Sequence, residues 1–456
     1  MAEQNASTPT GAQKEAEPKM LAMFLPGNST VELRQVPVPT LTRDTDVLVR
    51  IRASTICGSD IRCIYKEHLG QGPERYQNVI AGHEPCGEVV RCGKGTRRFQ
   101  PGDRVVIYHI SGCGVCVDCR KGFMISCRSE KFRRAYGWQR DGGMAEFCVA
   151  EEKDLLPLPE GLTFLDGALV ACGFGTVFEA LTKIQVSGRD SLLVTGMGPV
   201  GLAAAVVGAK LGAKRIICVD RDEDRCVLGR GLIVRALSRS KKGLEGQIET
   251  ASSNGGGQEG ESEGSQPPPE LHVICSCSGS VATGNGVEMD GDGISSLNGK
   301  FNFSSKGPEG IFRMPGTDAA LDLIRCLCAG GKDFSVKSQG LNRNAGAEKS
   351  IDCSGNAEAR ALCVRGTKDF GCVALVGEGG KLSVDASPDV IHGQKMIYGS
   401  WVTSVWLMEE LLCQLEEWGV HPEDLVTHAF PLQKSAEAYE VMSKGGKCGK
   451  VGMVVQ

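Results

Sequence analysis

The chain has 456 residues, of which 51 are basic and 55 acidic, giving a formal net charge of −4. This length predicts two domains, each large enough for its own hydrophobic core. No basic stripe or interleaving of basic and aromatic residues is present, which argues against nucleic acid or an anionic membrane as a partner and favours small molecules.

The 21 cysteines indicate a reducing compartment, because many stand in apolar runs, as Cys218, Cys353 and Cys372 do. Residues 1–19 contain no apolar core of a signal peptide and too many acidic residues for a transit peptide. We expect this segment to be a disordered tail and the protein to be cytoplasmic. In such a compartment, clustered cysteines are typical of metal ligands rather than disulfides.

From about residue 20 to 159, short β-branched runs alternate with Gly, Pro and Asp turns, which predicts an all-β, barrel-like lobe. Four cysteines within it are spaced C-x2-C-x2-C-x7-C, a pattern typical of tetrahedral Zn²⁺ binding. They are Cys113, Cys116, Cys119 and Cys127. Four thiolates leave the ion no open position, so this site is predicted to be structural.

A second possible metal set consists of Cys57, the pair His83 and Glu84, and Cys172. Two cysteines and one histidine would hold Zn²⁺ with one position free for a substrate oxygen. Spacing alone does not establish this set, because a single cysteine is more often a buried apolar thiol. The joint occurrence with the His-Glu pair and with a dinucleotide loop favours the ligand interpretation.

After Asp166 the pattern becomes helix, strand, glycine loop, helix and strand, which is a βαβ unit. Further strands are expected at 348–355, 371–378 and 395–402, with helices at 317–330 and 356–364 between them. The fold class is therefore α/β, with a doubly wound parallel sheet. We expect residues 173–401 to form a Rossmann domain, and residues 20–172 and 402–456 to form the metal-binding domain. The two most apolar stretches, 167–178 and 192–212, contain glycines and are read as buried elements, so no membrane segment is expected.

The loop Gly196-Met197-Gly198-Pro199-Val200-Gly201 matches G-x-G-x-x-G between a strand and a helix, where glycines let the backbone approach a pyrophosphate. Asp220 ends the next strand, where a carboxylate would bind the ribose 2′-hydroxyl and repel a 2′-phosphate. This favours NAD over NADP. Arg221 and Arg225 weaken that preference, because an arginine there can accept the phosphate.

One segment does not fit this scheme. Asp220 and Ile351 are 131 positions apart, whereas two crossovers need about 60 residues. The surplus lies at about 231–313, which is rich in Gly, Ser, Glu and Pro and is not expected to bury a core. Two hypotheses stand: a disordered insertion, or translated non-coding sequence from a faulty gene model. Peptides from Gln247 to Lys306 in the natural protein would rule out the second.

These residues resemble the zinc-dependent medium-chain alcohol dehydrogenase family from about Met20 to Gln456, apart from the surplus segment. The resemblance is carried by CGSD at 57–60, GHEPCG at 82–87, the four-cysteine lobe and GMGPVG at 196–201. It implies a GroES-like β-barrel catalytic domain, a Rossmann domain, two zinc ions per chain and a homo-oligomer, either dimer or tetramer. By the same resemblance, Cys57, His83 and Cys172 ligate the catalytic zinc.

The resemblance also implies roles for residues around that zinc. Glu84 is the neighbouring carboxylate and occasional ligand, Asp60 orients His83, and Ser59 opens the proton relay. The positions expected to contact the cofactor are Gly196, Gly198, Val200, Gly201, Asp220, Arg225 and Thr176, and Lys450 matches a basic residue near the phosphates. The histidine that often ends the relay is missing, because Ile61, Arg62 and Cys63 follow Asp60.

The activity that the resemblance implies is hydride transfer from an alcohol to NAD by way of a zinc-bound alkoxide. The CGSD segment is similar to the polyol and threonine dehydrogenase branch, whereas ACGFGT with Cys172 is similar to the ethanol-type branch. A secondary alcohol or polyol is therefore expected, with a primary alcohol as the alternative. A non-catalytic zinc and nucleotide-binding homologue, disabled by the surplus segment, is the alternative from another class. A zinc-free reductase is disfavoured by the cysteine lobe.

Overall fold

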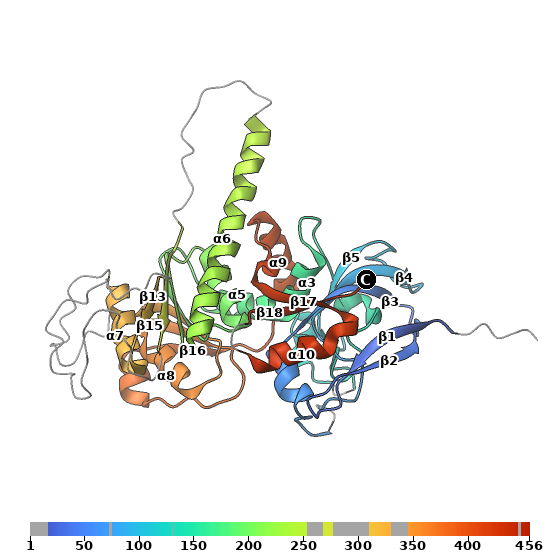
Figure 1. Ribbon diagram of the computed structural model, residues 1–456, viewed down its shortest axis with the longest axis horizontal. Coiled ribbons are helices and arrows are strands. Elements are labelled where there is room, and N and C mark those ends of the chain that lie inside the picture. The colour runs from blue at the N-terminus through green and yellow to red at the C-terminus, as the bar shows by residue number, and fades with distance from the viewer. Residues whose placement is uncertain are drawn as a thin grey trace, which may run out of the picture.

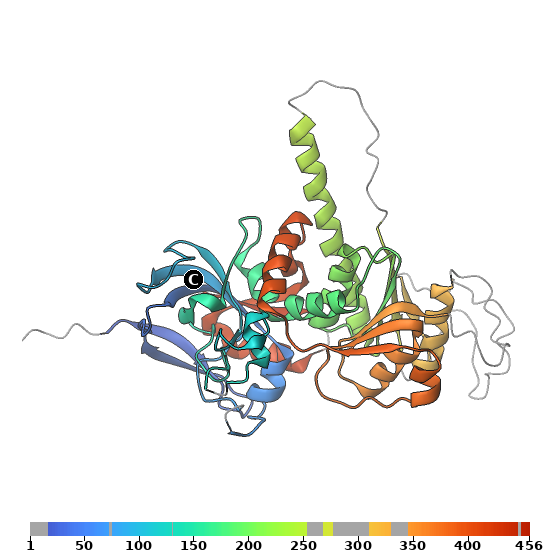
Figure 2. The ribbon, with the colours of Figure 1, turned by 180° about the vertical axis from the view of Figure 1, so that it is seen from behind.

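The computed structural model describes residues 17–72, 75–129, 131–252, 268–276, 310–329, 345–445 and 448–456. The chain forms two lobes that lie side by side, each built on a seven-stranded sheet (Figure 1). The first lobe contains the N-terminal strands, and the second contains the middle of the chain. Seen from behind, the second lobe runs from green to orange beside the blue and cyan first lobe (Figure 2).

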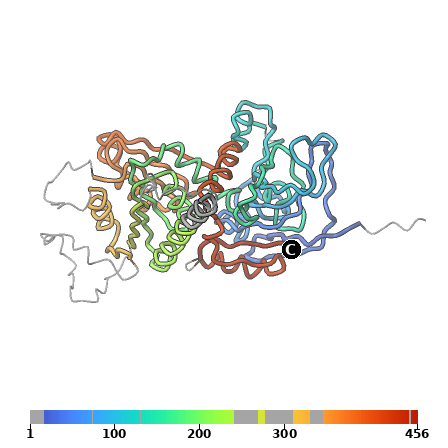
Figure 3. The backbone as a smooth tube through the Cα atoms, turned by 90° about the horizontal axis from the view of Figure 1, so that it is seen from above, coloured from blue at the N-terminus to red at the C-terminus, as the bar shows by residue number. Residues whose placement is uncertain are grey.

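The first lobe is organised around the long strand β3 (Asp46–Ile56), whose sequence DVLVRIRASTI is rich in β-branched residues. This strand pairs antiparallel with three others: β4 (Pro85–Cys92), β8 (Phe147–Glu151) and β18 (Lys450–Val454). The other strands of this sheet are β5 (Arg104–Ile107), β9 (Leu155–Pro157) and β17 (Val426–Pro431). The C-terminal segment therefore belongs to the first lobe, as Figure 3 shows from above.

Two short ribbons complete this lobe. The first consists of β1 (Lys19–Phe24) and β2 (Glu32–Pro37), and the second of β6 (Ile110–Ser111) and β7 (Arg134–Ala135). Residues 1–16 of the predicted tail lie outside the described residues. The predicted end of the tail at residue 19 is wrong, because Lys19 already pairs with Pro37 in β1.

A continuous helical stretch from 164 to 183 leads from the first lobe to the second. It comprises α3 (Phe164–Leu169), η5 (Val170–Phe174) and α4 (Gly175–Lys183), and Thr163 and Asp166 form a capping box at its start. The predicted boundary between residues 172 and 173 falls inside η5. This stretch is 20 residues long, and its most apolar window has a mean hydropathy of 1.5, so by length and composition it could cross a membrane. However, 72% of that window is buried inside the protein. That burial is typical of a core helix.

The second lobe is a parallel sheet in the order β13, β12, β11, β10, β14, β15, β16, and this order confirms the predicted doubly wound α/β fold. Its strands are β10 (Ser191–Thr195), β11 (Arg215–Asp220), β12 (Glu270–Cys275), β13 (Ile311–Arg313), β14 (Ala347–Asp352), β15 (Thr367–Leu375) and β16 (Met396–Gly399). Successive residues of each strand face opposite sides of the sheet. Leu192 packs toward α5 (Pro199–Lys210) and α6 (Glu223–Ser252), while Leu193 packs toward α7 (Gly316–Cys328) and α8 (Ala357–Arg365).

The expectation of one disordered block at 231–313 is wrong for the part that the structure describes. Ile233 and Ala236 of α6 are buried, and β12 and β13 extend the sheet beyond β11. Residues 253–267 and 277–309 lie outside the described residues, so both hypotheses about the surplus segment stay open for them. Figure 1 shows α6 extending well beyond the body of the second lobe.

The remaining elements lie mostly between the lobes and in the first lobe. They are α1 (Gly58–Asp60), η1 (Ile61–Tyr65), α2 (Val117–Arg120), η3 (Met124–Ser126), η4 (Glu152–Asp154), η8 (Ala386–Ile391), α9 (Val405–Glu417), η9 (Pro422–Leu425), η10 (Leu432–Lys434) and α10 (Ser435–Lys444).

Candidate metal and cofactor site

Three separate elements of the first lobe bring one cluster of ligand-type side chains together. Cys57 follows β3 and caps α1, His83 and Glu84 directly precede β4, and Cys172 lies in η5. Their ligand atoms all lie within 4.8 Å of one another. His83 and Glu84 are buried, and both thiols are half-buried. The structure thus assembles all four residues that the sequence singled out for an open metal site.

Asp60 fixes two members of this cluster. Its Oδ1 accepts a hydrogen bond from Nδ1 of His83 over 2.8 Å, and its Oδ2 accepts one from the backbone N–H of Cys57 over 2.9 Å. Asp60 is fully buried. Because Nδ1 is engaged, only Nε2 of His83 is left to face the cluster, which is the usual way in which a carboxylate orients a metal-binding histidine.

Glu84 has a cationic partner at the rear of the cluster. The ammonium of Lys450 in β18 lies 2.6 Å from Oε2 and 2.9 Å from Oε1 of Glu84, and the hydroxyl of Thr55 donates to the same carboxylate. Burial raises the pKa of Glu84 to about 7 against the opposing effect of Lys450. The expectation that Lys450 lies at the cofactor phosphates is corrected here, because its side chain is buried and paired with Glu84.

The side chains of the cluster differ in how readily they hold a proton. The thiol of Cys172 donates to Cys57, which lowers the pKa of Cys57 well below its usual range and raises that of Cys172. Although burial opposes protonation of His83, Asp60 raises the pKa of that imidazole well above its ordinary value. Two thiols, an imidazole and a carboxylate are ligand types suited to Zn²⁺. In chemistry and spacing, the donor set therefore fits that ion.

The four-cysteine lobe forms a second cluster between β6 and β7. The ligand atoms of Cys113, Cys116, Cys119 and Cys127 lie within 4.8 Å of one another. Backbone N–H groups point at the sulfurs, as from Cys116 to the Sγ of Cys113 over 3.3 Å. The N–H of Cys119 lowers the pKa of Cys116 to about 6, so a thiolate is favoured there. Four sulfurs with such donors fit a closed tetrahedral zinc site.

The glycine loop between β10 and α5 has the geometry of a pyrophosphate cradle. Gly196 has a φ of +91°, and a Cβ on Gly201 would lie 1.8 Å from the carbonyl oxygen of Gly196. Only glycine is possible at both positions. A Cβ on Gly198, in contrast, would meet no described protein atom within 4 Å. The open space above Gly198, at the N-terminus of α5, fits a phosphate group.

Asp220 holds this loop in place from the end of β11. Its Oδ2 accepts the N–H of Met197 over 2.7 Å, and its Oδ1 accepts the N–H of Asp222 over 3.0 Å. Arg225, on the first turn of α6, reaches toward the first lobe, since its Nη2 lies 3.2 Å from the point that a Cβ of Gly445 would occupy. The sequence assignment of both residues to the cofactor cleft is compatible with these positions and stays a prediction.

Ser59, Thr176 and Val200 are half-buried. Ser59 lies in α1, Thr176 one turn after Cys172 in α4, and Val200 at the start of α5. Their roles in the proton relay and at the nicotinamide stay predictions.

Arg62, two residues after Asp60, makes a contact between the lobes. Its Nη2 donates to Oε2 of Glu378 over 2.7 Å, and the indole N–H of Trp401 donates to Oε1 of the same carboxylate over 2.8 Å. Glu378 follows β15 of the second lobe. Arg62 therefore connects the first lobe to the second.

One residue of the site was missed from the sequence. His109, between β5 and β6, is 5% exposed, and its ring lies 5.5 Å from the ring of His83. Its Nδ1 is 2.6 Å from the carbonyl oxygen of Ala171, the neighbour of Cys172. Burial, together with the charge of His83, lowers the pKa of His109 to about 3. The only signal in the sequence was its place four residues before the first cysteine of the lobe.

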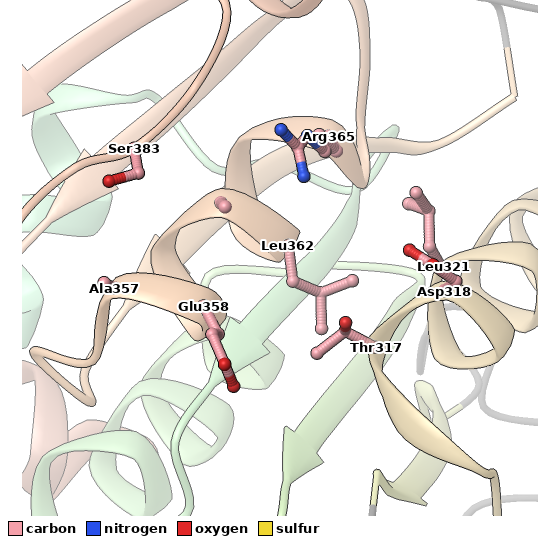
Figure 4. A pocket seen from close by; sticks show the side chains of 9 residues that line it. Thr317, Asp318, Leu321, Ala357, Glu358, Leu362, Arg365 and Ser383 are labelled. Atoms are coloured by element: carbon pink, nitrogen blue, oxygen red, sulfur yellow. The ribbon is translucent and has the colours of Figure 1, made fainter.

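A separate pocket of about 330 Å³ lies in the second lobe between α7 and α8 (Figure 4). It is lined by Thr317, Asp318, Leu321, Ala357, Glu358, Ala361, Leu362, Arg365 and Ser383. None of these residues belongs to the metal cluster or to the glycine loop. The pocket is therefore distinct from the candidate site.

Comparison with known proteins defines the class to which this fold and site belong. Residues 43–160 match the alcohol dehydrogenase GroES-like domain. The chain is 38% identical over 436 residues to YphC, a zinc-type alcohol dehydrogenase-like protein of Escherichia coli (strain K12), covering 95% of this chain and 98% of that one. The chain belongs to the zinc-dependent medium-chain alcohol dehydrogenase family, which is a family of oxidoreductases. Membership of this family implies that the chain uses zinc and a nicotinamide cofactor.

More distant similarities agree with this assignment. L-threonine 3-dehydrogenase of Rhizobium rhizogenes is 31% identical over 213 residues, which cover 46% of this chain and 60% of that protein. The alcohol dehydrogenase TADH of Thermus sp. ATN1 superposes with a TM-score of 0.67 at 21% identity, over 96% of this chain and all of that one. This last similarity confirms the two-lobed fold.

Proposed function

We propose that this chain is an NAD-dependent zinc dehydrogenase that oxidises a secondary alcohol or polyol. The observation that carries the proposal is the cluster of Cys57, His83, Glu84 and Cys172, together with the Gly196–Gly201 loop. Cys57, His83 and Cys172 would hold the catalytic zinc, with Glu84 beside it, and the four-cysteine lobe would hold a structural zinc. A primary alcohol substrate is the alternative.

The chain's own residues have separate tasks in such a reaction. When bound, zinc and the nicotinamide supply the Lewis acid and the hydride acceptor. Asp60 keeps Nε2 of His83 directed at the cluster, and Lys450 balances the charge of Glu84. Ser59 would take the proton of the substrate hydroxyl and pass its own proton on. The carbinol carbon gives up its hydrogen as hydride, so one proton and one hydride leave for each carbonyl formed.

The proposed preference for NAD rests on Asp220. A carboxylate at the end of β11 favours a free ribose 2′-hydroxyl and repels a 2′-phosphate. Arg225 is the competing feature, because it lies on the first turn of α6, shortly after β11, and an arginine there can accept a 2′-phosphate. Initial rates with NAD and with NADP at equal concentration decide between them, and a higher kcat/KM with NADP would overturn this part of the proposal.

The proposed substrate class rests on the CGSD segment and on the threonine dehydrogenase relative. L-Threonine carries its reacting hydroxyl on a secondary carbon. The alternative of a disabled homologue is not favoured by any observation, because the sheet runs without interruption from β11 through β12 to β13. The expected oligomer, a dimer or tetramer of this chain, is likewise a proposal, which sedimentation velocity tests.

The test combines metal analysis with a substrate screen. We expect two zinc ions per chain and cofactor reduction with secondary alcohols or polyols faster than with primary alcohols. A protein that holds both zinc ions and binds NADH, yet turns over no alcohol in a broad panel, would overturn the proposed activity. Faster turnover of primary alcohols would select the alternative.

A further inference from the structure

Two loops of the second lobe meet where the strand order of the sheet reverses. β11 lies on one side of β10 and β14 lies on the other. The β14 loop (residues 353–356) follows β14, and the β15 loop (residues 376–380) follows β15. In an open parallel sheet, a ligand binds outside the carboxyl ends of the strands at such a reversal. Both loops therefore border the position predicted for the cofactor.

The two loops are packed tightly against the glycine loop and against each other. A Cβ on Gly196 would lie 2.8 Å from the Cβ of Ser354 in the β14 loop. A Cβ on Gly355, whose φ is +68°, would overlap the carbonyl oxygen of Glu378 in the β15 loop. Such close packing transmits a displacement of one loop to its neighbours. The shape of the β15 loop is thus linked to the shape of the glycine loop.

One buried ion pair joins the two loops. Asp352, the last residue of β14, is fully buried, and Arg360 of α8 is 8% exposed. The Asp352 carboxylate accepts hydrogen bonds from the hydroxyl of Ser354 over 2.6 Å and from the N–H of Gly355 over 3.2 Å. The guanidinium of Arg360 donates from Nε to the same carboxylate over 3.0 Å and from Nη2 to the carbonyl oxygen of Gly377. The pair therefore holds both loops at once.

The chemistry of this pair favours a role in geometry over a role in stability. A well-packed apolar pair of similar volume often stabilises a fold as much as a buried ion pair does. A guanidinium differs from other side chains in its planar fork, which holds several acceptors in fixed directions. Here the acceptors of Arg360 belong to two different loops. Both loops lie on the side of β10 away from β11, where Asp220 marks the proposed adenosine site.

We propose that Asp352 and Arg360 are positioning residues that hold the β14 and β15 loops in the shape needed to bind the nicotinamide half of the cofactor. This inference rests on the proposed function and deepens it. Both side chains are buried and act through the backbone of the loops. The β15 loop also carries Glu378, which contacts Arg62 of the first lobe. The same pair thus positions the second lobe's side of that contact.

The variant Arg360→Lys separates this role from charge balance. Lysine keeps a cation beside Asp352, so no buried carboxylate is left unpaired, but its single ammonium lacks the fork that also reaches Gly377. The matched control is Arg365→Lys on the same helix. Arg365 also donates from Nε to a carboxylate over 3.0 Å, that of Asp389, and it lines the separate pocket between α7 and α8 (Figure 4).

The ligands are NADH and 5′-AMP, of which the second contains the adenosine half alone. We expect Arg360→Lys to raise the Kd for NADH about 10-fold, which corresponds to the loss of one hydrogen bond to a charged group. The Kd for 5′-AMP should stay at the wild-type value, which also shows that the variant is folded. Arg365→Lys should change neither constant. Isothermal titration calorimetry measures both.

Three outcomes would overturn the proposal. Equal losses for NADH and 5′-AMP in Arg360→Lys would show a general loosening of the second lobe. A loss confined to 5′-AMP would place the effect on the adenosine half, and unchanged binding of both ligands would show no role at all. A wild-type protein that binds NADH but oxidises no alcohol would overturn the proposed function alone, because both dissociation constants are measured without turnover.

Discussion

The Asp60 carboxylate is a single group that orients two of the predicted zinc ligands, His83 and Cys57. Removal of this group in Asp60→Ala frees the ring of His83 and the N–H of Cys57 together. We expect the affinity for the catalytic zinc to fall about 10- to 100-fold, because a hydrogen-bonded carboxylate orients its histidine ligand. Competition with a chromogenic chelator measures this affinity.

A matched control for that variant is Asp46→Ala. Asp46 is also a buried carboxylate, and it accepts hydrogen bonds from Thr42 and from the N–H of Arg43, away from the metal cluster. Both variants should lose stability, but only Asp60→Ala should lose zinc. Equal zinc affinity in the two variants would show that Asp60 does not orient the ligands.

Lys450 and Glu84 form a buried ion pair whose two halves depend on each other. In Lys450→Met, the Glu84 carboxylate keeps only Thr55 as a described partner outside the metal cluster. Removal of one partner of a buried pair costs about 3–5 kcal/mol. We expect a loss of this size in the free energy of unfolding of the metal-free protein, measured by urea titration.

The double variant Glu84→Gln/Lys450→Met tests the cause of that loss. It removes both charges, so a large part of the stability should return. If the double variant were as unstable as Lys450→Met alone, lost packing of the lysine side chain would account for the effect, and the ion-pair explanation would fail.

At the residue scale, the sequence predicted the ligand clusters and the Asp60 partner of His83, but not the contacts of His109 and Lys450. Cys57 and the pair His83 and Glu84 stand in short motifs that identify them without a fold. His109 and Lys450 have no such motif, because their partners, Ala171 and Glu84, lie 62 and 366 positions away. Such contacts exist only once the sheet has brought β18 beside β3, so spacing along the chain does not reveal them.

The start of α3 is an element whose stability can be tested alone. The hydroxyl of Thr163 accepts the N–H of Asp166, and Asp166 in turn accepts the N–H of Glu423 and the ring N–H of His421. The cap therefore joins α3 to η9 as well. Thr163→Ala should lower the free energy of unfolding by about 0.5–2 kcal/mol.

A suitable control for this cap is Ser443→Ala in α10. The Ser443 hydroxyl makes an exposed bond to the carbonyl of Glu440, so its removal should change stability by no more than about 0.5 kcal/mol. Urea midpoints of the two variants compare them directly. A smaller effect at Thr163 than at Ser443 would contradict the capping role.

At the element scale, hydrophobic runs and glycine loops predicted most of the second sheet. β10, β11, β14, β15 and β16 all fall where strands were expected. β12 was missed, because its sequence ELHVIC is six residues long and is flanked by a Pro-rich stretch and by residues without periodicity. The Gly-, Ser- and Pro-rich composition around this short apolar run led to the prediction of disorder. The parallel pairing with β11 shows that the run is a strand.

At the scale of the whole molecule, a hydrophobic core cluster spans both lobes, and the ion pair of Arg62 with Glu378 joins them at a surface that water reaches. Arg62 and Glu378 are each 47% exposed in their side chains. Exposed pairs contribute about 0–1 kcal/mol. Arg62→Met should therefore change the free energy of unfolding by less than about 1 kcal/mol, which urea titration checks. A loss of several kcal/mol would mean that this contact is required for the lobes to fold together.

The position of β18 has a consequence for how the protein is made. The Glu84 carboxylate leaves the ribosome long before Lys450, which is 366 residues later in the chain. At a synthesis rate of about 5–20 residues per second, this interval is on the order of tens of seconds. During that time the first lobe lacks both a central strand and the cation for its buried carboxylate. A nascent chain is thus expected to hold its first lobe open until the second lobe has been translated, and to depend on chaperones for that period.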